Sequence, residues 1–227
     1  MKITPDVSFL ELQELNTAIY GIANDRIYSN HDFSLKIQRY TTMALKAIRK
    51  GRFDQVPWCL VMATSWTMAL ANRMHIDLDD EIWQRFPGAC PYCAGKKCSC
   101  KERRLTRATD LPHDDPLRPR TVREYQKMFA RIYSANTLDD SKSHLAEEIA
   151  EVAEAVQHYS ATHRPELFEE IRLELTDVVS CVFAVSNCMP FDLASSIYEF
   201  FGEGRCPKCK KPKCRCGFTV ATLVARS

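Results

Sequence analysis

Apolar residues recur at helical spacing in the two most strongly patterned stretches of the chain. In residues 145–156 the apolar positions follow i, i+4, i+7, i+8, i+11 spacing, and residues 171–185 show the same kind of stripe. Such a period places these side chains on one face of an α-helix. No alternating run with hairpin turns stands out. The pattern predicts an all-α protein built from small bundles of about four helices.

Three stretches of sequence occur twice, in the same order. Residues 26–29 (RIYS) return at 131–134, and the pattern N-x-M-x-x-D-L begins at Asn72 and again at Asn187. A four-cysteine motif with identical internal spacing spans residues 90–100 and 206–216. The offsets are 105 and 115 residues, so the second copy carries about ten more residues between its first two motifs. We expect a duplication.

The same comparison predicts the division of the chain. A first unit covers residues 1–104 and a second covers 121–227, each ending in its four-cysteine tail. Between them, residues 105–120 contain three prolines and no helical period, which is typical of a linker. We expect the two units to pack against each other as a pseudo-dimer within the chain.

Acidic residues of the second unit follow a pattern that suggests a metal site. Glu147, Glu148 and Glu151 lie on the first patterned stretch, and Glu174 and Asp177 lie on the next. At about 100° per residue, all but Glu147 fall at the same edge of the apolar face of their helix. Converging carboxylates repel unless a cation lies among them, and oxygen ligands favour Mg²⁺ or Mn²⁺. A di-iron bundle is disfavoured because neither helix carries Glu-x-x-His.

This arrangement resembles the MazG-type nucleotide pyrophosphohydrolases. The resemblance rests on EExxE, a spacer of 22 residues and ExxD, followed by FAVSNCMPFDL, and it covers residues 121–203 well. It extends more weakly over residues 15–86, where ALANRMHIDL closes a helix without acids. The family implies an all-α, Mg²⁺-dependent enzyme that cleaves nucleoside triphosphates to monophosphate and pyrophosphate, and that is a dimer or higher oligomer.

The resemblance also implies roles for the acidic residues. Glu148, Glu151, Glu174 and Asp177 would be the metal ligands, with Glu147 nearby as a further ligand or as the base. Such an ion neutralises charge on phosphoryl oxygens and activates a bound water. The sequence leaves open whether one or two ions bind, and which nucleotide is the substrate.

The first unit lacks these acids and is basic instead. Cys59 and Met62 stand where the second unit has its ExxD motif, and Lys36 and Arg39 lie on the preceding helix. We expect Lys36 and Arg39 to contact substrate phosphates; the alternative is that they are ordinary solvated side chains. Asn187 is a candidate nucleotide contact. Asn72 stands at the equivalent position of the first unit, which lacks the acidic site, so a structural role is favoured for Asn187.

The two cysteine tails are typical of structural zinc sites. Each reads C-x-x-C, four residues, C-x-C, which supplies four thiolates within eleven residues. The alternative is a set of reactive thiols. The first set is Cys90, Cys93, Cys98 and Cys100, and the second is Cys206, Cys209, Cys214 and Cys216. Both tails are rich in lysine, but few aromatic residues accompany them, so we do not expect nucleic acid as a partner.

Composition narrows the class of protein. The net charge of +2, the 45% hydrophobic content and the 26% charged content are ordinary for a soluble globular protein. No apolar run reaches the roughly 20 residues of a spanning helix, and residues 1–15 show no signal peptide, so we expect a cytoplasmic protein without a membrane partner. A nucleotide pyrophosphohydrolase is the favoured function. The alternative is a non-catalytic, zinc-stabilised binding or adaptor module, with nucleic acid as one candidate partner.

Overall fold

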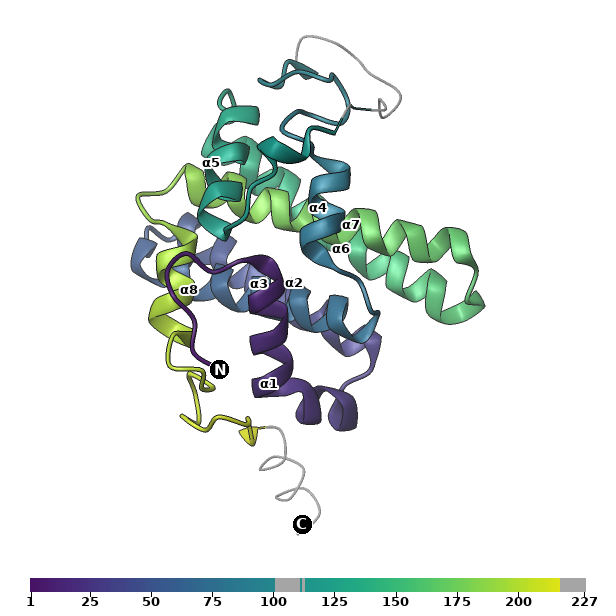
Figure 1. Ribbon diagram of the computed structural model, residues 1–227, viewed down its shortest axis with the longest axis vertical. Coiled ribbons are helices and arrows are strands. Elements are labelled where there is room, and N and C mark those ends of the chain that lie inside the picture. Colours follow the sequence, from purple (N-terminus) through teal and green to yellow (C-terminus); the bar gives the residue numbers. More distant parts are fainter. Residues whose placement is uncertain (101–110, 112, 217–227) are drawn as a thin grey trace.

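The computed structural model describes residues 1–100, 111 and 113–216, and within these residues it is all-α, as predicted (Figure 1). The α-helices are α1 (Phe9–Ile27), α2 (Asn30–Arg49), α3 (Val56–Arg73), α4 (Leu78–Arg85), α5 (Val122–Ile132), α6 (Leu138–Thr162), α7 (Pro165–Asn187) and α8 (Leu193–Phe201). Two short 3₁₀ helices, Phe53–Gln55 and Asp115–Leu117, lie in connections. In the part of the chain that is described, no helix combines the length and apolar character needed to cross a membrane.

Local sequence signals fix where several helices begin. Ser8, Ser29, Thr121 and Thr137 each accept a hydrogen bond from the backbone three residues later, and an acidic side chain there accepts one in return. Such capping boxes satisfy backbone N–H groups that have no partner inside the helix. Helix α7 begins instead with Pro165, whose fixed φ suits the first turn.

The two halves of the chain interlock. Helices α2 and α3 pack closely together, as do α6 and α7, and the two pairs contact each other through α2 with α6 and α3 with α7. The last helix of each half then packs on the other half, α4 against α7 and α8 against α3. One continuous hydrophobic core includes residues from both halves. Each predicted unit therefore buries part of its apolar surface against the other.

Equivalent hydrogen bonds recur in the two halves. In each half, a glutamine of the first helix accepts two hydrogen bonds. Its side-chain oxygen accepts one from the backbone N–H at the start of the last helix of that half. Its backbone carbonyl accepts the other from an asparagine side chain. The sets are Gln13 with Asn72 and Leu78, and Gln126 with Asn187 and Leu193. Asn187 thus links α5 to the end of α7, which is a structural contact.

These bonds favour a different register for the predicted duplication. They pair Gln13 with Gln126, an offset of 113 residues, whereas the RIYS match had given 105. The difference arises because α1 has 19 residues and α5 only 11, so the RIYS match aligns the ends of two helices of unequal length. Helices α6 and α7 are also longer than α2 and α3, and they project as a hairpin beyond the core (Figure 1).

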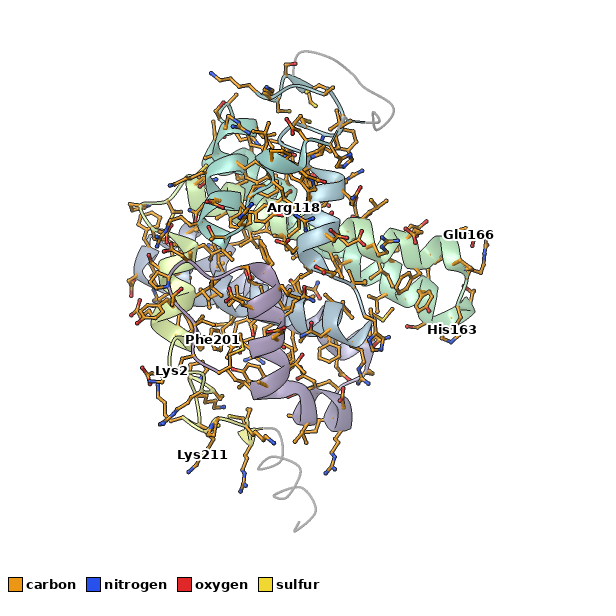
Figure 2. The ribbon with its side chains drawn as sticks, viewed as in Figure 1. Lys2, Arg118, His163, Glu166, Phe201 and Lys211 are labelled. Carbon is orange, nitrogen blue, oxygen red and sulfur yellow. The ribbon has the colours of Figure 1, made fainter. Side chains whose placement is uncertain are left out.

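The described part of the predicted linker is fastened to α4. Asp115 accepts a hydrogen bond of 3.3 Å from the Trp83 indole. Arg118, which is labelled in Figure 2, forms ion pairs of 2.6 and 2.8 Å with Asp79 and Asp80. Residues 101–110 and 112 lie outside the described residues. The segment that precedes α5 therefore runs along the helix that precedes the first cysteine tail.

Each cysteine tail packs on the opposite half of the chain. The Cys98 N–H donates to the Ile132 carbonyl at 2.6 Å, and the Cys214 N–H donates to the Ile19 carbonyl at 2.7 Å. Ile132 belongs to α5 and Ile19 to α1, in positions that share the 113-residue offset. The tails consequently lie at opposite ends of the molecule (Figure 1).

Candidate functional site

Three carboxylates converge where α6 packs against α7. Glu148 and Glu151, three residues apart on α6, and Glu174 on α7 each place one carboxylate oxygen within 4.8 Å of the other two. The i, i+3 spacing puts the first two on one face of their helix, and the packing of the hairpin brings the third opposite them. The structure therefore groups three of the four carboxylates that the sequence pattern predicts as metal ligands.

The electrostatics of this cluster favour a bound cation. Burial, together with the negative charges of the neighbouring carboxylates, raises the pKa of Glu148 to about 9 and that of Glu174 to about 7. The Oε2 atoms of both residues are buried and accept no hydrogen bond in the part of the chain that is described. Unsatisfied buried carboxylate oxygens are costly, and a divalent cation would satisfy them. These residues fit a hard metal ion.

Asp177 lies beside the cluster and is held by an arginine from the other half of the chain. Arg85 Nη2 is 3.1 Å from Asp177 Oδ2, and its Nε is 3.4 Å from Oδ1. Both side chains are about one-eighth exposed, at 13% and 12%. Burial raises the pKa of Asp177, while Arg85 opposes that shift. The fourth predicted ligand is thus engaged with Arg85, a residue at the end of α4.

Sequence reasoning missed Arg85. It lies 92 residues before Asp177, in a helix without the acidic pattern, so no local spacing connects the two. The only signal was that α4 belongs to the basic unit predicted to approach the site. Arg85 also donates a hydrogen bond of 3.2 Å to the Tyr92 hydroxyl, and its guanidinium lies 5.5 Å from the centre of that ring. Arg85 therefore connects the acidic cluster to the first cysteine tail.

A cavity of about 490 Å³ opens beside the carboxylates. Glu147, Glu148 and Asp177 lie on its α6–α7 side. The first cysteine tail and three aromatic residues make up much of the rest of the lining. These are Phe86, Tyr92 and Tyr133, and the polar side chains of Asn136 and His144 also line the cavity. The volume lies in the range of small-molecule binding pockets.

The predicted phosphate contacts lie elsewhere. The Lys36 ammonium is 5.6 Å from the centre of the Tyr28 ring and 5.9 Å from that of Trp66, both in the first half. Arg39 lines a separate cavity along α2. Neither side chain is among those that line the cavity beside the carboxylates. A cation of the first half that does reach the acidic residues is Arg85, through its ion pair with Asp177.

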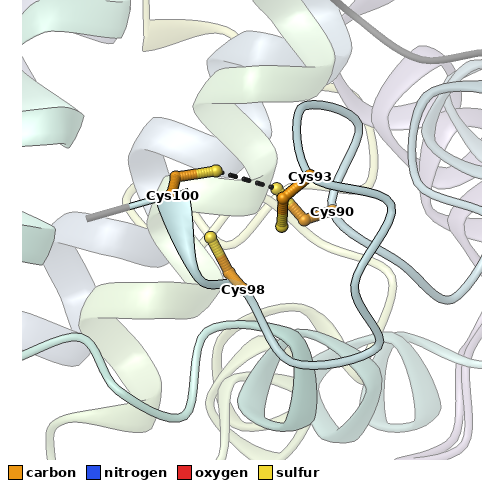
Figure 3. Close-up of side chains that lie close together, drawn as sticks. All are labelled: Cys90, Cys93, Cys98 and Cys100. Atoms are coloured by element: carbon orange, nitrogen blue, oxygen red, sulfur yellow. Dashed lines mark hydrogen bonds between the residues drawn. The ribbon is translucent and has the colours of Figure 1, made fainter. Parts of the chain in front are cut away.

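Both cysteine tails form compact clusters. We call them the first Cys module (Cys90, Cys93, Cys98 and Cys100) and the second Cys module (Cys206, Cys209, Cys214 and Cys216). Within each module the four sulfur atoms lie within 4.8 Å of one another, and in the first they point toward a common centre (Figure 3). The Cys90–Cys100 and Cys206–Cys216 sulfur distances are 3.6 and 3.9 Å. A tetrahedral zinc with Zn–S bonds of about 2.3 Å requires about 3.8 Å. Each module has the geometry to hold its own zinc ion.

Protonation of the thiols also fits metal binding. Burial acts to raise the pKa of Cys93, but hydrogen bonds from backbone N–H groups of the module and from neighbouring thiols lower it to about 6. Cys209 of the second Cys module behaves in the same way. One thiolate, the form that binds zinc, is therefore available in each module near neutral pH.

Comparison with known proteins gives one match. Residues 136–209 match the model of the MazG nucleotide pyrophosphohydrolase domain, a segment that contains α6, α7, α8 and all the acidic residues of the site. No curated protein and no solved structure matches the chain. MazG enzymes typically use Mg²⁺. Residues 136–209 are therefore a MazG nucleotide pyrophosphohydrolase domain, which implies a nucleotide pyrophosphohydrolase activity.

Proposed function

We propose that the protein is a Mg²⁺-dependent pyrophosphohydrolase that cleaves a nucleoside or deoxynucleoside triphosphate to the monophosphate and pyrophosphate. The observation that carries this proposal is the convergence of Glu148, Glu151 and Glu174 within the segment that matches the MazG domain. Within the described residues, the buried Oε2 atoms of Glu148 and Glu174 have no hydrogen-bond partner, which favours a hard cation at this position. A polyanionic triphosphate is the kind of substrate that such a centre binds.

The proposed roles of the side chains follow from their positions. Glu148, Glu151 and Glu174 hold the cation, and Asp177 is oriented by Arg85 at the edge of the same cluster. Mg²⁺ held by these residues would neutralise charge on the phosphoryl oxygens and would make an attacking water more acidic. Glu147 lines the cavity next to these residues and serves as the candidate acceptor of the water proton. Arg85 places a positive charge beside the position of the phosphates.

We further propose that the two halves are duplicated MazG-like units, with boundaries at 1–104 and 121–227, that pack as a pseudo-dimer with one active site. The recurring glutamine–asparagine bonds and the reciprocal packing of the two Cys modules support this interpretation. The half that lacks the four predicted metal-binding carboxylates then contributes Arg85 and the first Cys module to the site. Zinc in each module is structural in this proposal.

Product analysis tests the proposed reaction. Zinc-loaded protein is incubated with a panel of nucleoside and deoxynucleoside triphosphates, with and without Mg²⁺, and the products are separated by ion-exchange chromatography. We expect monophosphate and pyrophosphate only with Mg²⁺, and loss of turnover in Glu174→Ala. A matched control is Glu170→Ala, which removes an exposed glutamate from the same helix one turn earlier. Release of orthophosphate instead of pyrophosphate, or turnover that survives in Glu174→Ala, would contradict the proposal.

A further inference from the structure

The first Cys module differs from the second at one position that faces the candidate site. Tyr92 lies between the first two cysteines of its module, where the second module has Lys208. Tyr92 lines the cavity beside the carboxylates and is 43% exposed. The two modules share their cysteine spacing, so the metal does not require this tyrosine.

Tyr92 is also fixed in position. Its backbone is constrained by Cys90 and Cys93 on either side, and its hydroxyl accepts the 3.2 Å bond from Arg85. Arg85 in turn holds Asp177 at the edge of the acidic cluster. A ring held in this way, with part of its surface exposed to a cavity, is a preorganised platform for a planar ligand.

The rest of the cavity suits the same ligand. Phe86 and Tyr133 add apolar surface, and Asn136 and His144 offer hydrogen-bonding groups to the edge of a base. Glu148 belongs both to the acidic cluster and to the lining of this cavity, which the first Cys module also lines. A nucleotide whose phosphates reach the cation can therefore place its nucleoside in the cavity, against the first Cys module.

We infer that the first Cys module is part of the substrate site: its Tyr92 ring stacks on the nucleobase of the substrate in the 490 Å³ cavity, while the phosphates extend to Glu148, Glu151 and Glu174. This inference rests on the proposed function. It assigns different roles to the two modules, since the second Cys module packs on α1 at the other end of the molecule (Figure 1).

The test compares a probe that has a base with one that lacks it. Isothermal titration calorimetry with Mg²⁺ measures the Kd of the best-binding α,β-imido nucleoside triphosphate, chosen from a panel of five bases, and the Kd of inorganic tripolyphosphate. The variants are Tyr92→Leu, Tyr92→Phe and, as the matched control in the second module, Lys208→Leu. Zinc content and circular dichroism establish that each variant is folded and metal-loaded.

We expect Tyr92→Leu to bind the nucleotide about tenfold more weakly, within the range of base–aromatic stacking. Its Kd for tripolyphosphate should stay within about twofold of the wild-type value. The Kd of Tyr92→Phe and of Lys208→Leu for the nucleotide should also stay within about twofold of the wild-type value. Equal weakening for both probes would mean that Tyr92 acts only through Arg85, and no weakening for either would mean that the base lies elsewhere. Both results overturn the inference while leaving triphosphate hydrolysis intact. If the wild-type protein neither binds nor cleaves any nucleotide, the proposed function fails and the inference fails with it.

Discussion

The ion pair between Arg85 and Asp177 should contribute strongly to folding, because it joins the two halves in a buried setting. Replacing Arg85 with leucine leaves the Asp177 carboxylate with little access to water and close to the negative charges of the acidic cluster. Breaking a buried pair from one side costs about 3–5 kcal/mol. Protonation of Asp177 relieves part of this cost, so we expect Arg85→Leu to lower the free energy of unfolding by about 3 kcal/mol at pH 8.

The cost should depend on pH with a definite sign. In the variant, the pKa of Asp177 in the folded protein lies further above its unfolded value, because burial remains and the opposing Arg85 is gone. An acid whose folded pKa is raised carries no penalty below its unfolded pKa; the penalty grows as pH rises from the unfolded to the folded pKa and is complete above the folded pKa. The loss caused by Arg85→Leu should therefore be smaller at pH 5 than at pH 8.

Urea unfolding followed by circular dichroism measures this effect in a double-mutant cycle. In an Asp177→Asn background, Arg85→Leu should cost only about 1 kcal/mol, because no buried charge is left. Arg172→Leu is the matched control: Arg172 also joins the halves, through Glu81, but it is one-third exposed and should contribute less than about 1 kcal/mol. An equal cost of Arg85→Leu in both backgrounds, or one that does not change with pH, would refute the reasoning.

Three further predictions concern the acidic cluster, the two Cys modules and the repeated glutamine. Mg²⁺ should bind more tightly as pH rises from 6 to 9, and binding should release protons, because the raised pKa values of Glu148 (about 9) and Glu174 (about 7) leave these carboxyls partly protonated. Calorimetry in buffers of different ionisation enthalpy measures this release. A binding enthalpy that is the same in all buffers would contradict it. Plasma mass spectrometry should find two zinc ions per chain and one in either Cys98→Ser or Cys214→Ser, and an unchanged count would contradict two separate sites. Gln126→Leu should lower the free energy of unfolding by about 1–3 kcal/mol, since it leaves the buried N–H at the start of α8 without its acceptor; a urea titration that shows no change would refute this.

Much of the fold and of the acidic site could be predicted from the sequence, because both depend on short-range spacing. The helical period gave the all-α class, and capping residues such as Thr137 define where helices begin. Glu148 and Glu151 are three residues apart, and α6 and α7 are joined by a turn of two residues, so their meeting with Glu174 follows from local geometry. The clustering of each four-cysteine motif follows for the same reason.

Contacts between distant segments could not be predicted in this way. Lys36 and Arg39 were chosen because they lie on the helix of the first unit that corresponds to α6. Helix α2 does pack on α6, but neither side chain lines the cavity beside the carboxylates, whereas Arg85 of α4 pairs with Asp177. Arg85 and Tyr92 reach the site because α4 packs on α7 and the first Cys module packs on α5. A helix period gives the face that is buried, but not the helix that buries it.

The sequence by itself thus determined the helices, the acidic cluster and the cysteine modules, because residues a few positions apart are held together by the backbone itself. Only the tertiary structure decided that each module crosses to the other half, that Asp177 is paired with Arg85, and that Asn187 links α5 to α7. The physical reason is that these contacts depend on how the two halves bury their apolar faces against each other. That arrangement is set by the sum of many long-range packing contacts, and no single motif encodes it.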